Sequence, residues 1–100
     1  MSGEWIWTNT SAPDGTWTDI ASDASGQYLV AVQSQDCWFD HRNYNYQCTT
    51  GSIYTSSTGG STWTQTTAPD GRWGSVVTSY TGQVIFAAQQ NGIYISTNGT

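Results

Sequence analysis

Short apolar stretches separated by turn residues run along the whole chain, and none of them has the 3.6-residue period of a helix. Residues 28–32 and 84–88 are continuously apolar, which is typical of strands buried on both faces. Residues 62–66 alternate one large aromatic with Thr and Gln, as expected of an outer strand. The pattern predicts an all-β chain. Its expected strands are, in chain order, 17–22, 28–32, 53–56, 62–66, 73–79, 84–88 and 93–96.

These strands form two imperfect copies of one unit. The segment 7–17, WTNTSAPDGTW, returns at 63–73 as WTQTTAPDGRW, a shift of 56 residues. Further along, IYTS at 53–56 returns as IYIS at 93–96, a shift of only 40. The difference, 56 − 40 = 16, is an insertion in the first copy, which the alignment places at 35–50. The basic unit of roughly 40 residues has the size of a four-stranded β-propeller blade.

The link between two of these strands carries a family resemblance. Residues 56–63, Ser-Ser-Thr-Gly-Gly-Ser-Thr-Trp, resemble the Asp-box (BNR-like) repeat, whose pattern is Ser-x-Asp-x-Gly-x-Thr-Trp. Thr58 stands where the pattern has Asp, and Asn98 stands there in the second copy. The likeness covers nearly the whole chain outside the insertion and implies two four-stranded propeller blades per chain. It implies little about function, because sialidases, glucanases and non-enzymatic receptors all carry such boxes.

We expect a single two-blade unit over residues 1–100. In it, 17–66 form the first blade with its inserted loop, 73–100 form a second blade without its outer strand, and 5–10 form an outer strand that completes a neighbour's blade. Exchange of that strand removes exposed sheet edges, and symmetric assembly covers the flat faces. Propellers close with about four to eight blades. The resemblance favours a six-bladed homotrimer, with an eight-bladed tetramer next.

Composition narrows the partners. The formal net charge is −5, and Arg42 and Arg72 are the only cationic side chains besides His41. Such a chain lacks the basic footprint that nucleic acids and anionic membranes require. No apolar run is long enough to span a membrane, and the first residues lack the features of a signal peptide.

Two cysteines, Cys37 and Cys48, enclose ten residues of the insertion. We read them as a disulfide, which favours an extracellular location because such bonds persist in oxidising compartments. Two free thiols of a cytosolic protein are the alternative.

The insertion is the leading candidate for a binding site, since long loops concentrate function. It shares one face of the expected propeller with the two Ala-Pro-Asp-Gly loops. Aromatic rings stack on the apolar faces of sugars, and planar polar groups bond their hydroxyls. The alternatives are an insertion whose aromatics only pack, turns at Asp14 and Asp70, and packed rings at Trp17 and Trp73, of which the last is favoured. The candidate residues are Trp38, Phe39, Asp40, His41, Arg42, Asn43, Tyr44 and Tyr46, with Asp14, Trp17, Asp70 and Trp73 from the other two loops.

Catalysis finds little support. His41 is the only His, two Arg do not make a sialidase cluster, and His41 with two cysteines falls short of a zinc site. We therefore expect no catalytic residue, no metal and no cofactor. The sequence favours a multivalent, lectin-like carbohydrate-binding propeller. A ligand-free structural or engineered scaffold is the alternative. A glycoside hydrolase-like enzyme comes third, with Asp14 and Asp70, or Asp36 and Asp40, as its carboxylate pair.

Overall fold

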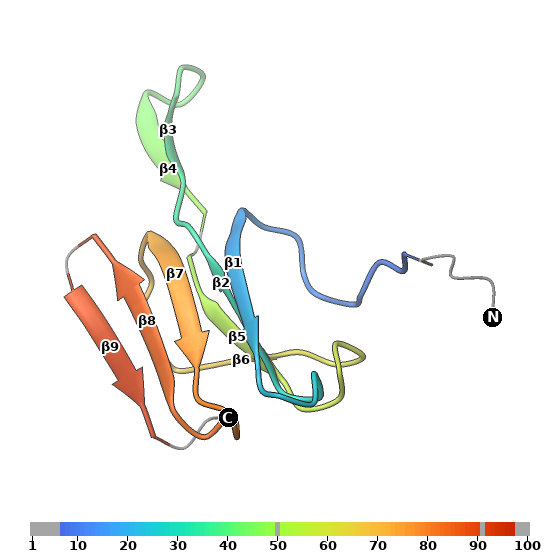
Figure 1. Ribbon diagram of the computed structural model, residues 1–100. Coiled ribbons are helices and arrows are strands. Elements are labelled where there is room, and N and C mark those ends of the chain that lie inside the picture. The colour runs from blue at the N-terminus through green and yellow to red at the C-terminus, as the bar shows by residue number, and fades with distance from the viewer. Residues whose placement is uncertain (1–6, 50, 91, 98–100) are drawn as a thin grey trace.

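All regular secondary structure is β-strand over the residues that the computed structural model describes, 7–49, 51–90 and 92–97. The strands form three antiparallel sheets (Figure 1). We call β1-β2-β5-β6 the large sheet, β7-β8-β9 the small sheet, and β3-β4 the hairpin. Within this part of the chain there is no helix that could cross a membrane. The strands are β1 (Trp17–Ser22), β2 (Leu29–Gln33), β3 (Cys37–Asp40), β4 (Asn45–Cys48), β5 (Ile53–Ser56), β6 (Thr64–Gln65), β7 (Trp73–Thr78), β8 (Ile85–Gln89) and β9 (Gly92–Ser96).

The strand predictions are confirmed in type and place, with shifts at the ends. β5 has the predicted bounds, whereas β2 and β8 begin one residue later than predicted and end one residue later. The predicted strand 62–66 shortens to β6, because the preceding turn holds Trp63 through a bond from its Nε1 to the Gly60 carbonyl at 3.1 Å. Residues 5 and 6 of the predicted first strand lie outside the described residues, and 7–10 form no strand in the single chain.

The large and small sheets pack face to face, with β1 against β7 (Figure 1). Alternate side chains of β2 point to this junction, which buries Val30 and Val32 completely. Hydrogen bonds also cross it: the Val76 N–H donates to Asp19 Oδ2 at 2.9 Å, and the Thr78 hydroxyl donates to the Ser22 carbonyl at 2.8 Å. The buried cluster between the sheets comprises Val30, Val32, Ile53, Trp73, Val76, Ile85 and Ala87.

The sequence repeat is also a repeat of local geometry. Trp17 and Trp73 each begin the first strand of their sheet, and each donates its Nε1 to the carbonyl of the proline four residues earlier, at 3.1 and 3.2 Å. Each indole also meets a tyrosine edge-on, Tyr54 at 5.6 Å and Tyr94 at 5.2 Å between ring centroids. The strand register shifts directly after both tryptophans. The shifts of 56 and 40 residues therefore relate equivalent positions of the two sheets.

The turn with the Asp-box resemblance is held by hydroxyl groups. The Ser56 hydroxyl accepts hydrogen bonds from the N–H groups of Thr58 at 3.3 Å and Gly60 at 2.9 Å. Thr58 Oγ1 accepts from the Thr62 N–H at 2.9 Å and lies 2.9 Å from the Thr62 hydroxyl. Thr58 therefore closes this turn through its hydroxyl. Its second-copy counterpart, Asn98, lies outside the described residues.

Candidate functional site

The insertion is a stapled hairpin that projects from the end of the large sheet (Figure 1). Its base contacts both Ala-Pro-Asp-Gly loops. The Thr16 hydroxyl donates to Asp36 Oδ2 at 2.5 Å, and the Gln35 N–H donates to the Gly71 carbonyl at 2.9 Å. Asp36 in turn accepts from the Thr49 N–H through its carbonyl at 2.8 Å. The insertion and the two loops thus gather at one end of the sheets.

Cys37 and Cys48 are bonded to each other, which confirms the predicted disulfide. They lie directly opposite each other as the first pair of the hairpin, followed by Trp38 with Gln47 and by Asp40 with Asn45 at the last pair. A cross-link at the open end removes conformational freedom from the unfolded loop, and by loop-length arguments this stabilises a loop of this size by about 3 kcal/mol. The bond orders the hairpin without help from a core.

The tip is also ordered by its own side chains. Asp40 Oδ1 accepts from the Arg42 N–H and Asp40 Oδ2 accepts from Asn43 Nδ2, both at 2.9 Å. Such a local carboxylate turn is a common way to hold a short loop. Tyr44 completes the loop with φ of +53°, the left-handed conformation that often precedes a returning strand. Arg42 and Asn43 are therefore presented at the tip of an ordered turn.

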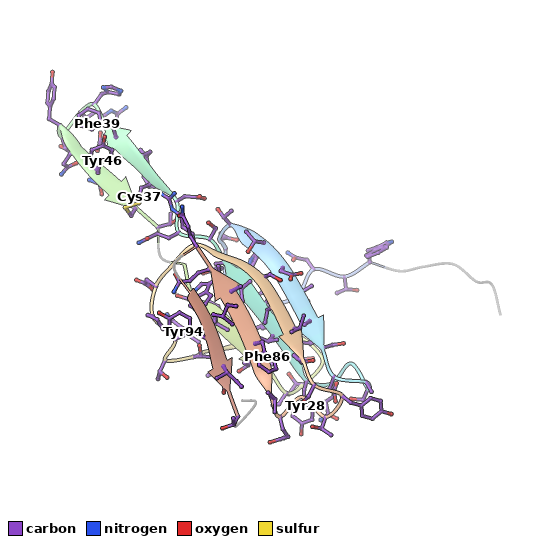
Figure 2. All side chains as sticks on the ribbon, turned by 60° about the vertical axis from the view of Figure 1, so that its left-hand side comes forward. Tyr28, Cys37, Phe39, Tyr46, Phe86 and Tyr94 are labelled. Atoms are coloured by element: carbon purple, nitrogen blue, oxygen red, sulfur yellow. A yellow bond between two sulfur atoms is a disulfide. The ribbon has the colours of Figure 1, made fainter. Side chains whose placement is uncertain are left out.

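One face of the hairpin carries an aromatic cluster. Phe39 and Tyr46 are cross-strand partners with ring centroids 5.4 Å apart, and the rings of His41 and Tyr44 meet Phe39 at 4.9 and 6.3 Å. All these contacts are edge-on, the arrangement that aromatic quadrupoles prefer. Figure 2 shows Phe39 and Tyr46 together near the tip of the hairpin. Their mutual packing stiffens the tip.

The opposite face, which we call the Trp38 face, carries a ring and polar groups. Because side chains alternate along strands, Trp38, Asp40, Asn45 and Gln47 share this side. Trp38 is 51% exposed although it lies in a strand. Its partner Gln47 donates through Nε2 to Asn45 Oδ1 at 2.8 Å, which aligns the two amides along β4. The Trp38 face thus joins an accessible ring to two amides and a carboxylate.

Asn45 and Gln47 are absent from the candidates predicted by sequence. Their signal is their alternation with Tyr46, which places them opposite Trp38 once the segment is known to be a strand.

The candidates from the two other loops do not join the hairpin faces. Asp14 and Asp70 are exposed in loops at the hairpin base. Trp17 is half-buried beside Tyr54 and lines a recess of about 680 Å³ on the large sheet together with Asp14. Trp73 is 0% exposed between the sheets. Its packed alternative therefore describes the single chain, in which no ring surface of Trp73 is open to a ligand.

In the described part of the chain, no group of three or more His, Cys, Asp or Glu side chains is placed to hold a metal ion. No protein-family model, curated protein or solved structure matches the chain.

Proposed function

We propose that the chain is a multivalent, lectin-like carbohydrate-binding protein whose ligand lies on the Trp38 face of the hairpin. The observation that carries the proposal is the half-exposed indole of Trp38 beside Gln47, Asn45 and Asp40. A sugar ring offers an apolar C–H face that suits an exposed aromatic ring. Its hydroxyls both donate and accept, which matches amides that do both and a carboxylate that accepts.

Three features support this ligand class. The Trp38 face is an open surface on a two-stranded ribbon, which suits a chain end or a branch of a glycan better than a molecule that needs enclosure. Its polar groups are mostly uncharged, and the chain is acidic overall, which disfavours anionic polymers. The disulfide and the Asp40 turn hold the hairpin before binding, so little conformational freedom is lost when a ligand arrives.

The second part of the proposal is multivalency through self-association. One open site of this kind binds weakly, and several sites on one particle raise the avidity by orders of magnitude. We propose that the large and small sheets act as blades of an Asp-box type β-propeller closed by copies of the chain. A six-bladed trimer is favoured and an eight-bladed tetramer comes next. The strand order β1-β2-β5-β6 and the face-to-face packing of the two sheets support this arrangement.

A glycan array probed with the wild-type chain tests the proposal, with Trp38→Ala as the site variant and Tyr80→Ala as the matched control. Tyr80 is an exposed aromatic outside the hairpin. We expect Trp38→Ala to weaken binding at least about tenfold, because loss of about 1.4 kcal/mol of stacking has that effect, and Tyr80→Ala to leave binding unchanged.

Each contrary result has a distinct meaning. An array on which the wild-type chain binds nothing favours the ligand-free scaffold. Binding that survives Trp38→Ala moves the site to the loops of Asp14 and Asp70. Release of reducing sugar from a bound glycan favours the hydrolase.

A further inference from the structure

The small sheet has one face that nothing in the chain covers. Val77, Phe86 and Ile95 form a row across its three strands, and they are 55%, 43% and 60% exposed. Phe86 stands out on the broad side of this sheet in Figure 2. A continuous apolar surface of this kind marks an interaction site. We call it the open face of the small sheet, formed by Val77, Phe86, Ala88, Ile93 and Ile95.

The repeat identifies what this face is built to meet. A shift of 56 residues relates Val77 to Ala21 and Phe86 to Val30. In the large sheet, Val30 is buried in the junction with the small sheet, and Ala21 packs against the same cluster. The open face of the small sheet therefore repeats the face by which the large sheet already binds a neighbouring sheet.

The large sheet has the complementary surface. Its own uncovered side, the open face of the large sheet, is formed by Trp17, Ile20, Leu29, Ala31 and Tyr54. Ile20 is 58% exposed there. The equivalents of Ile20, Leu29 and Ala31 are Val76, Ile85 and Ala87, which the small sheet buries in the internal junction. Each chain thus carries both halves of the junction that it contains, one on each outer side.

We infer that the open face of the small sheet docks the open face of the large sheet of a second copy, head to tail, in the geometry of the internal junction. This inference rests on the self-association of the proposed function and gives it an interface. One backbone contact carries over: the internal bond from the Ala24 N–H to the Tyr80 carbonyl, 3.1 Å, becomes one from the Tyr80 N–H to Ala24 of the second copy. Both groups are main-chain, so the repeat preserves them.

The cavity inside the chain points to the same second copy. About 610 Å³ lies between the two sheets, lined by Ile85, Ala87 and Tyr94 of the small sheet. At the equivalent place on the large sheet, beside Leu29 and Trp17, the chain seats its own Trp63.

The residue equivalent to Trp63 by the shift of 56 is Trp7, which is 91% exposed. A second copy docked on the open face of the small sheet brings its Trp7 to this cavity. Its residues Thr8 and Asn9 then pair with Ile95 and Tyr94 of β9, as Thr64 and Gln65 pair with β5. One neighbour thereby covers both sides of the small sheet.

The two junctions differ in polar contacts. Asp19, whose carboxylate binds the Val76 N–H at 2.9 Å, has Ser75 as its equivalent. Thr18, whose hydroxyl binds the Trp73 carbonyl at 2.5 Å, has Gly74. Charge-assisted bonds are stronger than neutral ones. The junction between copies is therefore the weaker of the two, and dilution separates chains before the sheets of one chain part.

Two variants and their mixture test the docking. Phe86→Asp places a charge on the open face of the small sheet, and Ile20→Asp places one on the open face of the large sheet. Both side chains are exposed in the single chain, so circular dichroism should report folded protein. The measurement is mass by light scattering against the chain mass of 10.9 kDa, with Gln83→Asp on an exposed turn as the charge control.

We expect the wild-type chain and Gln83→Asp to form multiples of the chain mass and each face variant alone to be a monomer. An equal mixture of Phe86→Asp and Ile20→Asp should give a two-chain species, because each variant retains the face that the other lacks. A wild-type monomer at about 100 µM overturns the inference. A mixture that stays monomeric overturns it as well, as does a dimer that pairs two identical faces.

Sugar binding is scored separately, so the two proposals fail independently. Monomeric Phe86→Asp retains an intact Trp38 face and should bind a soluble single-site glycan as the wild-type chain does. Its retention on a glycan-coated surface should fall, because the avidity is lost.

Discussion

Replacement of Trp73 by Ala tests the face-to-face packing of the two sheets. Trp73 is 0% exposed and is the largest fully buried side chain. A buried aromatic removes about 150–250 Å² from water, which at about 25 cal/mol per Å² corresponds to about 4–6 kcal/mol. Measured aromatic-to-Ala changes in cores cost about 3–5 kcal/mol. We expect a loss of about 4 kcal/mol, a large part of the 5–15 kcal/mol typical of a domain.

Trp17→Ala is the matched control, because Trp17 has the same repeat position, hydrogen bond and tyrosine contact. It lies on the open face of the large sheet and is only half-buried in one chain. In dilute, monomeric protein we therefore expect it to cost about half as much as Trp73→Ala. At concentrations where copies dock, its cost should approach that of Trp73→Ala, because a neighbour then covers it.

Urea denaturation followed by tryptophan fluorescence, at low and high protein concentration, measures both changes. A loss of about 4 kcal/mol lowers the thermal midpoint of a domain of this size by at least about 15 °C, so calorimetry offers a second readout. A cost below about 1 kcal/mol for Trp73→Ala would refute the packing of the two sheets against each other.

Three further outcomes follow from single contacts. Gly51→Ala should cost about 1–3 kcal/mol in urea denaturation, because its new Cβ overlaps the Gly71 carbonyl oxygen, whereas Gly74→Ala, with open space around it, should stay within about 0.5 kcal/mol; equal costs would contradict this reading. Reduction of the Cys37–Cys48 bond should speed amide exchange in β3 and β4 while the large and small sheets keep their protection, and a collapse of protection in β2 would show that the hairpin supports the core. Burial raises the pKa of Asp23, but hydrogen bonds from the Ser25 hydroxyl and from the N–H groups of Tyr28, Gly26 and Ser25 outweigh it and hold the pKa below 3.8; since the pKa is depressed by folding, the stabilisation is complete above pH 3.8 and is lost as the pH falls through the folded value, and a carboxyl titrating at or above 3.8 by NMR would contradict the turn.

The strands of the two sheets could be predicted because burial on both faces leaves a continuous apolar run. Residues 29–33 and 85–89 carry that signal, and the repeat confirms each by the other. The hairpin could not be predicted in the same way. Its neighbouring Trp38 and Phe39 point to opposite faces, so no alternation of apolar and polar residues marks the strand. The disulfide supplies the order that a core supplies elsewhere.

The different burial of Trp17 and Trp73 was also beyond the sequence. Both stand in the same Ala-Pro-Asp-Gly-x-Trp context, and both make the same local bonds. What separates them is the position of the other sheet, which covers one ring and leaves the other half open. Similarly, the pairing of Gln47 with Trp38 depends on the register of a hairpin that the spacing of two cysteines does not fix.

The place where the hairpin enters the chain has a further consequence. β2 and β8 occupy equivalent positions, yet β2 leads into the hairpin, whereas β8 returns to β9 by a tight connection in which Gln89 pairs with Gly92. The same strand end therefore accepts either a minimal turn or a long recognition element, and the core is the same in both cases. A transplant of residues 35–50 between Gln89 and Gly92 should double the number of binding elements per chain without a change in fold. Evolution can use the same freedom, since the specificity of such a chain can diverge in one segment that bears none of the packing.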